Sequence, residues 1–587
     1  MRRILSVLSL GLALVFTLSC FVSCKDDAEN PDTENDGFDI GAYKIVYSKK
    51  ASDDICTASM TLRKKINSSA KVDLKIEDDW YPEGTDVSAI KEILIGDTNR
   101  AETKALKTKL DGVKKDMAYA VEVSGNKIVI LGKNDSATMQ AMKYFINEFV
   151  CKSTGDGKIP MAADFSKAQL GDKDMIIYPE TLVGFTMSEE YTVFEPEQGR
   201  GSSQKNQYPT AIYLQYQANP ENNGKMLATL NSSESFYRIL RSDDEGKTWN
   251  AVTKLYEINP ANSSGNEPLQ AGRMPFLYEL PAKVGDFEKG TIFLAGTSSP
   301  IGGNAAKYER TAITMYYSTD LGKTWKYLPS VDYGKGRIDE NGVWEPFLIY
   351  EEETGRVYCF YSDATGENKD PVNPQPDQTL VYKYTTDMVN WTGKTGTGSY
   401  SDPFEAVASS DVDHRPGMVA ISKMTNGEYI LTYEFVGCKI GNNSTTFYKK
   451  TTRLDDWGDP ADMGHIVETV DGKTSGSGPW NSYTPVGGDC GILFTFARFG
   501  AHHHDKVNPD LTRPDIFISF DYGETFVTLE NPFDYTFVGD TSVDRTGYSV
   551  MFLVSPDGRS VFFFNNPPYF KGAETQIMKM VRIDIHP

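Results

Sequence analysis

The stretch Ser318-Thr319-Asp320-Leu321-Gly322-Lys323-Thr324-Trp325 decides the fold, because its pattern returns elsewhere in the chain. Two further copies keep the same spacing of serine, aspartate, glycine, threonine and aromatic residue: Ser242-Asp243-Asp244-Glu245-Gly246-Lys247-Thr248-Trp249 and Ser519-Phe520-Asp521-Tyr522-Gly523-Glu524-Thr525-Phe526. In such a turn the aspartate bonds to turn amides, and the glycine supplies a positive φ. We therefore expect these aspartates to be structural and not catalytic.

Two weaker copies, starting at Thr385 and Thr451, lie between the second and third turns. The five starts at 242, 318, 385, 451 and 519 are 76, 67, 66 and 68 residues apart. A fixed period indicates a repeat architecture. The pattern resembles the Asp box of sialidase-like propellers, which implies a mainly β fold with a six-bladed β-propeller over 178–587. We expect Thr546 to Asp584 to form the sixth blade, closed by a strand near Glu190 to Phe194; five blades is the alternative.

Two strand-like, otherwise apolar runs each contain one carboxylate. Glu345 lies in Val343–Tyr350 and Glu434 lies in Tyr429–Val436. An ionised carboxylate among packed apolar groups costs several kcal/mol unless it is paired or hydrogen-bonded, so two of them suggest a site. Glycosidic bonds are commonly broken by two carboxyl groups. The structural alternative is that both are strand-end glutamates satisfied by an arginine or a backbone amide.

Several segments fall at comparable positions early in the predicted second to sixth blades. They are Gly272-Arg273-Met274-Pro275-Phe276, Trp344-Glu345-Pro346, His414-Arg415-Pro416-Gly417-Met418, Tyr483-Thr484-Pro485 and Gly547-Tyr548-Ser549. The first strand of each propeller blade faces the central axis. We therefore expect these segments to converge on one axial site.

The order of five motifs resembles glycoside hydrolase family 93. The motifs are Arg273-Met274-Pro275, Trp344-Glu345-Pro346-Phe347-Leu348, Tyr361-Ser362-Asp363, Arg415-Pro416-Gly417-Met418 and Tyr433-Glu434. The resemblance implies an exo-acting glycosidase that releases arabinobiose from α-1,5-linked arabinan with retention. It makes Glu345 and Glu434 the nucleophile and acid/base pair, in an order that stays open although Glu345 is favoured as nucleophile. An insertion over Gly366 to Gln378 can alter the subsites.

The same resemblance suggests residues that bind the substrate. Arg273 and Arg415 are candidate donors to the ionised glutamate, with an ordinary ion pair as the alternative. The candidates for contact with sugar hydroxyls are Asp363, Tyr433 and Tyr548. Trp344 is a candidate for stacking on a sugar ring, and core packing is its alternative.

Two rival functions remain open. A sialidase shares the propeller and its boxes, and would draw three arginines from Arg273, Arg415 and either Arg498 or Arg545, with Tyr433 or Tyr548 as nucleophile. The Trp-Glu-Pro and Arg-Pro-Gly-Met segments match family 93 better. A surface propeller that binds glycan without cutting it is the other alternative, and the two intact glutamates count against it.

The N-terminus predicts export and lipidation. Residues 1–24 combine a basic start with an apolar segment that is too short for an ordinary spanning helix. Val22-Ser23-Cys24 resembles a lipobox, and Lys25-Asp26-Asp27 resembles a surface-export tag, so we expect a lipid on Cys24. Residues 25–37 then form an acidic tether. The predicted location is the cell-surface side of a bacterial outer membrane, where other glycan-uptake proteins are candidate partners.

Residues 38–175 predict a small α/β accessory domain. Strand patterns cover Tyr43–Tyr47 and Glu92–Gly96, a hairpin covers Ala120–Leu131, and helical patterns cover Ser52–Ile66 and Ser136–Phe149. The segment Glu92 to Arg100 resembles the domain that precedes the catalytic domain in hexosaminidase- and glucuronidase-type enzymes. This resemblance implies a non-catalytic support.

Charge and cysteine content exclude some partners. The net charge of −21 becomes about −23 without Arg2 and Arg3, which argues against nucleic acid and leaves neutral polysaccharides as partners. We expect no cofactor and no metal, including at His502-His503-His504, because adjacent histidines do not face one ion on regular backbone. A Cys56–Cys151 disulfide is left undetermined.

Overall fold

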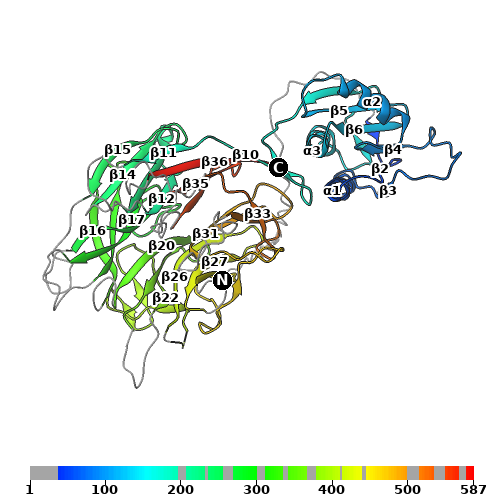
Figure 1. Cartoon of the computed structure of the whole chain (residues 1–587). Helices are drawn as coiled ribbons and strands as arrows, with labels where there is room; N and C mark the ends of the chain where they lie inside the picture. Colours follow the sequence, from blue (N-terminus) through cyan, green and yellow to red (C-terminus); the bar gives the residue numbers. More distant parts are fainter. Residues whose placement is uncertain are drawn as a thin grey trace, which may run out of the picture. The chain divides into compact units, whose positions relative to one another are not determined.

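The chain is described here from a computed structural model (Figure 1). The structure describes residues 37–587 except for 196–206, 232–235, 256–268, 301–310, 335–340, 367–377, 410, 412, 439–443, 499–514, 534–548 and 567–576. The chain divides into two compact units, Met1–Gly171 and Asp172–Pro587. None of the described helices is both long and apolar enough to cross a bilayer.

The first unit is built on one six-stranded sheet. Its strand order is β3-β2-β4-β6-β5-β8, with parallel pairing from β3 to β6 and antiparallel pairing from β6 to β8. The strands are β2 (Lys44–Tyr47), β3 (Ile76–Asp78), β4 (Glu92–Ile95), β5 (Ala118–Ser124), β6 (Lys127–Gly132) and β8 (Ser166–Leu170); a separate pair joins β1 (Phe38–Asp39) to β7 (Lys158–Ile159). The predicted hairpin of β5 and β6 is present.

Three helices belong to this sheet. They are α1 (Asp53–Ala70), α2 (Ala101–Asp111) and α3 (Asp135–Phe145), and a π-helical turn η1 (Ile146–Val150) extends α3. Ser52 caps α1 by accepting the amide of Ile55, and Asn134 caps α3 by accepting the amide of Ala137. The two predicted helices therefore start within two residues of their expected positions, whereas α2 was not predicted.

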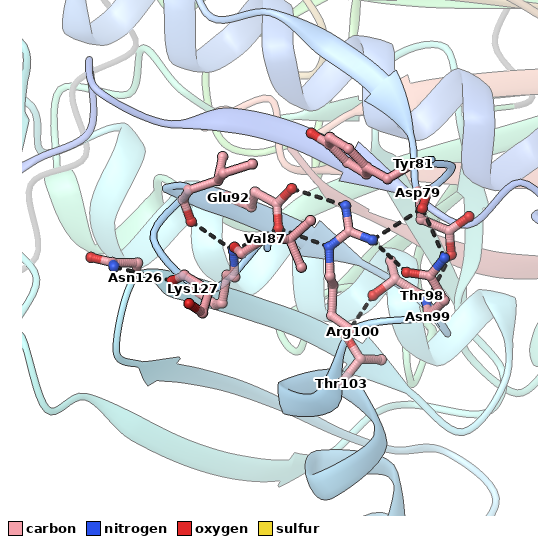
Figure 2. Close-up of polar contacts among 12 residues, drawn as sticks. Asp79, Tyr81, Val87, Glu92, Thr98, Asn99, Arg100, Thr103, Asn126 and Lys127 are labelled. Atoms are coloured by element: carbon pink, nitrogen blue, oxygen red, sulfur yellow. Dashed lines mark hydrogen bonds and ion pairs between the residues drawn. The ribbon is translucent and has the colours of Figure 1, made fainter. Parts of the chain in front are cut away.

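A buried ion cluster ties β4, α2 and β6 together (Figure 2). Glu92 is fully buried and lies between Arg100, whose Nε and Nη2 are 3.0 Å from its two carboxylate oxygens, and Lys127, whose Nζ is 2.7 Å away. Lys127 also donates to the carbonyls of Val87 and Ile90 at 2.6 Å. Burial raises the pKa of Glu92, but the hydrogen bonds from both cations outweigh it and hold this pKa below the ordinary value.

Asp79 and Tyr81 extend the ion cluster to the loop that follows β3 (Figure 2). The Asp79 carboxylate accepts the amide of Asn99 at 2.7 Å, and its carbonyl accepts Nη1 of Arg100 at 3.0 Å. The Tyr81 ring lies 4.8 Å from the guanidinium carbon of Arg100. The loop, a strand and a helix are thus fixed by one set of ionic contacts.

The second unit contains six sheets in sequence order, which Figure 1 shows running from green to red around a common centre. The first blade contains β12 (Gln207–Tyr213), β13 (Met226–Asn231), β14 (Tyr237–Ser242) and β15 (Asn250–Leu255), and the second contains β16 (Leu269–Glu279), β17 (Ile292–Pro300), β18 (Ala312–Ser318) and β19 (Lys326–Tyr333). The third blade contains β20 (Val343–Glu351), β21 (Arg356–Asp363) and β22 (Thr379–Thr385), with the short strands β23 (Thr392–Gly393), β24 (Gly396–Thr397) and β25 (Phe404–Val407). The fourth blade contains β26 (Arg415–Lys423), β27 (Tyr429–Val436), β28 (Ser444–Thr451) and β29 (His465–Ile466), and the fifth contains β30 (Ser477–Thr484), β31 (Ile492–Arg498), β32 (Ile516–Ser519) and β33 (Val527–Leu529). A short 3-10 turn, η2 (Pro220–Asn222), precedes β13.

The sixth blade joins the two ends of this unit. It comprises β34 (Met551–Val554), β35 (Ser560–Asn565) and β36 (Met578–His586), and β36 pairs with both β10 (Val183–Met187) and β11 (Tyr191–Phe194). β9 (Ile176–Tyr178) completes the sheet beside β10. Each blade's first strand contacts the first strand of the next, and β34 contacts β12, so the ring closes. The six-bladed prediction and its closing strand are confirmed, and the five-bladed alternative is excluded.

The repeated turns connect the third and fourth strands of their blades. In the box between β18 and β19, the amide of Gly322 donates to Ser318 Oγ at 3.0 Å and that of Thr324 donates to Asp320 Oδ1 at 2.9 Å. The indole N–H of Trp325 donates to the carbonyl of Gly322 at 2.9 Å. Gly322 has a φ of +77°, as expected. The box aspartates are therefore structural.

The cysteine pair left open by the sequence does not form a bridge. Cys56 is partly buried on α1 and Cys151 is exposed after η1, and both are thiols in the structure. The first unit is thus held by its packed sheet and by the ion cluster.

Removing Arg100 should destabilise the first unit strongly. In the Arg100→Ala variant the Glu92 carboxylate stays buried after losing both hydrogen bonds from the guanidinium, so we expect a loss of about 3–5 kcal/mol in the unfolding free energy of this unit. Hydrogen exchange of the β4 amides in the full chain measures the effect. Lys107→Ala is the control, because Lys107 pairs with Asp97 at the exposed surface and should cost less than about 1 kcal/mol. Equal losses in the two variants would contradict the account.

Candidate active site

Six residues with left-handed backbone surround the propeller axis, one within or just before the innermost strand of each blade. We call them the ring residues: Tyr208 (φ 50°), Met274 (47°), Glu345 (64°), Met418 (55°), Gly478 (69°) and Ser549 (56°). In the first five blades the pairing register shifts at this point, which marks a β-bulge. A bulge re-aims side chains and is common beside active sites.

The ring residues border a partly open pocket. All of them except Gly478 contribute to its lining. Phe276, Phe347 and Trp480 also line it, and they pack on one another with ring centroids 4.7, 6.1 and 5.8 Å apart. The pocket therefore combines an aromatic wall with one carboxylate, Glu345, which the sequence predicted.

Glu345 receives hydrogen bonds from its own blade, the third, and from the first and fourth blades. Its Oε1 accepts the hydroxyl of Tyr208 at 3.0 Å, and its Oε2 accepts Ser362 Oγ at 2.8 Å and the amide of Met418 at 3.1 Å. Burial raises the pKa of the Glu345 carboxyl above its ordinary value, and these three donors and the positive charge of Arg415 offset the rise only in part. Glu345 can thus hold a proton at a higher pH than an exposed glutamate.

Glu434 lies one strand further out, in the blade that follows Glu345. It is 8% exposed, and its Oε2 accepts the amide of Gly478 at 2.9 Å. Glu434 pairs across the sheet with Gly417, as Ser362 pairs with Trp344 in the preceding blade. Glu434 therefore occupies the position in its blade that Ser362, a hydrogen-bond donor to Glu345, occupies in the preceding blade.

Gly417 leaves room for this arrangement. A Cβ at this position would lie 2.3 Å from Gln378 Nε2, 2.9 Å from Ser362 Oγ and 3.4 Å from Glu345 Oε2. A larger residue would push against the side chains that hold Glu345. The pairing of Gly417 with Glu434 also connects the surroundings of the two carboxylates, which belong to adjoining blades, but of the two only Glu345 lines the pocket.

The two predicted arginines lie beside the ring. Arg273 immediately precedes Met274 and is exposed, and its carbonyl accepts the hydroxyl of Tyr237 at 3.1 Å. Arg415 is exposed three residues before Met418, and its charge acts on Glu345. Both stay candidates for binding substrate at the pocket mouth.

Three other predicted residues make contacts within the fold. Trp344 is 7% exposed, and its indole N–H donates to Gln378 Oε1 at 2.9 Å. Tyr433 is fully buried, and its hydroxyl donates to the carbonyl of Met463 at 2.5 Å. Asp363 accepts the amide of Thr365 at 2.7 Å. These side chains are absent from the pocket lining, and their predicted contacts with a sugar stay predictions.

Several predicted residues lie outside the described part of the chain. They are Cys24, His502, His503, His504, Arg545 and Tyr548, and for Arg498 only the backbone is described. Within the described residues, no group of three His, Cys, Asp or Glu side chains could hold a metal ion.

Sequence reasoning missed Tyr208 and misplaced the fifth blade. Tyr208-Pro209 repeats the pattern of Met274-Pro275 and Glu345-Pro346 about one blade earlier, and this dipeptide could have revealed it. The fifth blade begins at Ser477-Gly478-Pro479, whereas the predicted Tyr483-Thr484-Pro485 lies at the far end of β30. Both segments contain a proline, so only the strand register in the structure shows which of them lies at the ring.

Comparison with known proteins supports the fold. A model described as BNR/Asp-box repeat matches residues 316–327. No curated protein matches this chain in sequence. Among solved structures, the α-L-arabinanase of Penicillium chrysogenum complexed with arabinobiose is 25% identical over 68% of this chain and 98% of its own, with a TM-score of 0.50.

A second solved structure gives the same fold. The family GH93 α-L-arabinofuranosidase of Fusarium graminearum with arabinobiose is 22% identical over 67% of this chain and 97% of its own, with a TM-score of 0.51. Each match covers a share of this chain close to that of the second unit. The second unit is therefore an Asp-box propeller with the six-bladed fold of these enzymes.

Proposed function

We propose that this chain is a retaining, exo-acting glycoside hydrolase that cleaves α-1,5-linked arabinan. The observation that supports the proposal is that Glu345 and Glu434 belong to adjoining blades and that each accepts a backbone amide from a ring residue of the next blade. Two carboxyl groups at one site are what hydrolysis of a glycosidic bond requires. The neutral sugar also agrees with the negative net charge of the chain.

Two solved relatives supply the substrate class. The Penicillium chrysogenum and Fusarium graminearum enzymes are an arabinanase and an arabinofuranosidase, each complexed with arabinobiose. We transfer this substrate to the present chain because the order of motifs around Glu345 and Glu434 resembles the same family. The exo action is transferred on the same resemblance, and the aromatic wall formed by Phe276, Phe347 and Trp480 offers an apolar surface for a sugar ring.

In the mechanism we propose, Glu345 is the nucleophile and Glu434 is the acid/base. Glu345 attacks the anomeric carbon of the terminal unit while Glu434 gives its proton to the departing glycosidic oxygen. A covalent glycosyl ester forms on Glu345. Glu434 then takes a proton from water, the water oxygen displaces Glu345, and the configuration is retained. The three hydrogen bonds to Glu345 orient its carboxylate for attack, and they can stabilise the anion that forms again when water displaces the sugar.

The sialidase alternative finds less support in the pocket. A sialidase holds the carboxylate of its substrate with a cluster of arginines. Among the described residues that line this pocket none is arginine or lysine, and Arg273 and Arg415 lie beside the ring and not in the lining. The apolar wall suits a neutral sugar better than an anionic one.

Surface anchoring through a lipid on Cys24 is part of the proposal. It rests on the lipobox-like Val22-Ser23-Cys24 and the acidic tether that follows. The Cys24→Ala variant should be lost from the membrane fraction of cells, and its retention there would contradict anchoring through a lipid on Cys24.

The decisive activity measurement is product analysis on linear α-1,5-arabinan. We expect arabinobiose as the product of the wild-type protein, and a fall in kcat of at least about 1,000-fold in both Glu345→Gln and Glu434→Gln because each removes a group that acts in the transition state. Circular dichroism checks that both variants fold. A sialylated oligosaccharide is the parallel substrate, and release of free sialic acid would contradict the proposal.

The pH profile of Tyr208→Phe tests the role of Glu345. The Tyr208 hydroxyl bonds the ionised carboxylate, so removing it should raise the pKa of Glu345 further. A nucleophile must be ionised, and the acid limb of kcat/KM should therefore move to higher pH, with a fall of about 10-fold at the wild-type optimum. Tyr213→Phe, on the same strand but outside the pocket lining, should leave the limb in place. Movement of the alkaline limb alone would make Glu345 the acid/base.

A further inference from the structure

The ring residues are an unusual choice for left-handed backbone. A side chain with a Cβ costs conformational free energy at positive φ, and glycine avoids this cost. Gly478 has the expected residue type, and a Cβ there would lie 2.9 Å from the amide nitrogen of Ser549. The other five ring residues keep side chains against this preference. Strain of this kind is concentrated at functional sites.

Four of these five side chains already have a role. Tyr208 donates to Glu345, which is the proposed nucleophile. Met274 and Met418 form apolar parts of the pocket wall. Ser549 is left without an explanation, because a small polar side chain adds little packing and does not remove the strain.

Ser549 carries a buried hydroxyl that has no hydrogen-bond partner among the described residues. The residue is 6% exposed and lines the pocket, and its Oγ bonds to none of the side chains or main-chain groups that the structure describes. The indole N–H of Trp480, in the same lining, is likewise buried and has no partner in the described part of the chain. Buried polar groups are normally satisfied, so an unsatisfied pair in one pocket points to a ligand that supplies the missing bonds.

The ring order places Ser549 opposite the proposed nucleophile. Glu345 belongs to the third blade and Ser549 precedes the first strand of the sixth, and in a closed ring of six blades these positions face each other across the axis. A ligand that fills the pocket is therefore met by a carboxylate on one side and by a free hydroxyl on the other. A sugar ring presents hydroxyl groups around its edge and suits both.

We propose that Ser549 is a specificity-determining residue, whose Oγ hydrogen-bonds one hydroxyl of the furanose unit held against Glu345, with the Trp480 indole N–H as a second donor. This inference rests on the proposed function. A site built to bond a hydroxyl rejects an analogue that lacks it, because the site's own polar group is then left unpaired. Ser549 would thus select sugars by the position of one hydroxyl.

The test compares α-1,5-arabinotriose with its monodeoxy analogues, each modified at the non-reducing end. We expect the wild-type protein to lose about 10-fold to 100-fold in kcat/KM on one analogue. Ser549→Gly and Ser549→Ala should lose a similar factor on the parent trisaccharide and discriminate against that analogue by less than about 3-fold. Glycine relieves the backbone strain and alanine keeps it, so agreement between the two variants assigns the effect to the hydroxyl.

Ser444→Ala is the matched control. Ser444 on β28 is 3% exposed and also has an unbonded Oγ, but it is absent from the pocket lining. Its removal should change neither kcat/KM nor the discrimination. Melting temperatures of all variants show whether a lost rate reflects unfolding, and Ser549→Gly should melt no lower than wild type.

The outcomes separate this inference from the proposed function. If wild type cleaves arabinotriose and both Ser549 variants cleave and discriminate as it does, the inference alone fails. The same holds if the Ser549 variants lose rate but still discriminate, since Ser549 would then hold only a buried water. If wild type neither cleaves nor binds the trisaccharide, the proposed function fails and the inference fails with it.

Discussion

The left-handed residue within or just before each innermost strand is the constraint on which this site depends. In a regular strand, successive side chains alternate between the two faces of the sheet. Six regular inner strands would therefore present the same limited kind of surface to the axis. The bulge at each ring residue breaks this alternation at one point. Six blades with similar outer turns can therefore carry different groups at the axis, among them a phenol, a carboxylate, two thioethers and a hydroxyl.

The backbone at the ring residues also makes the burial of Glu345 and Glu434 tolerable. Glu345 and Glu434 are costly to bury, and each receives the main-chain amide of the ring residue in the next blade. An amide on a bulge is not used by the strand ladder and is available for this purpose. Stability and reactivity are thereby linked, because the donors that make burial tolerable also orient the groups that react. The Asp boxes contribute at a distance, by fixing the outer strands that hold each blade in place.

The sequence predicted the blades well because Asp boxes are local. Each box is a turn whose bonds lie within eight residues, so Ser318 to Trp325 can be recognised without knowledge of its neighbours. Glu345 and Glu434 were found because a charge in an apolar run is improbable without a reason. The prediction failed where contacts cross blades. Tyr208 reaches Glu345 over 137 positions, and no local pattern contains that distance.

Orientation was the other property that the sequence could not supply. Tyr433 and Glu434 are adjacent, yet successive residues of a strand face opposite sides, and only Glu434 meets the amide of Gly478. Trp344 is similarly turned toward Gln378, beside a glutamate that lines the pocket.

The central claim is that the axial pocket holds the sugar. A crystal structure of Glu434→Gln with α-1,5-arabinotriose tests it most directly. The account predicts the terminal furanose between Glu345 and Ser549, within hydrogen-bond distance of both, and trisaccharide bound elsewhere with only water in the pocket would contradict it.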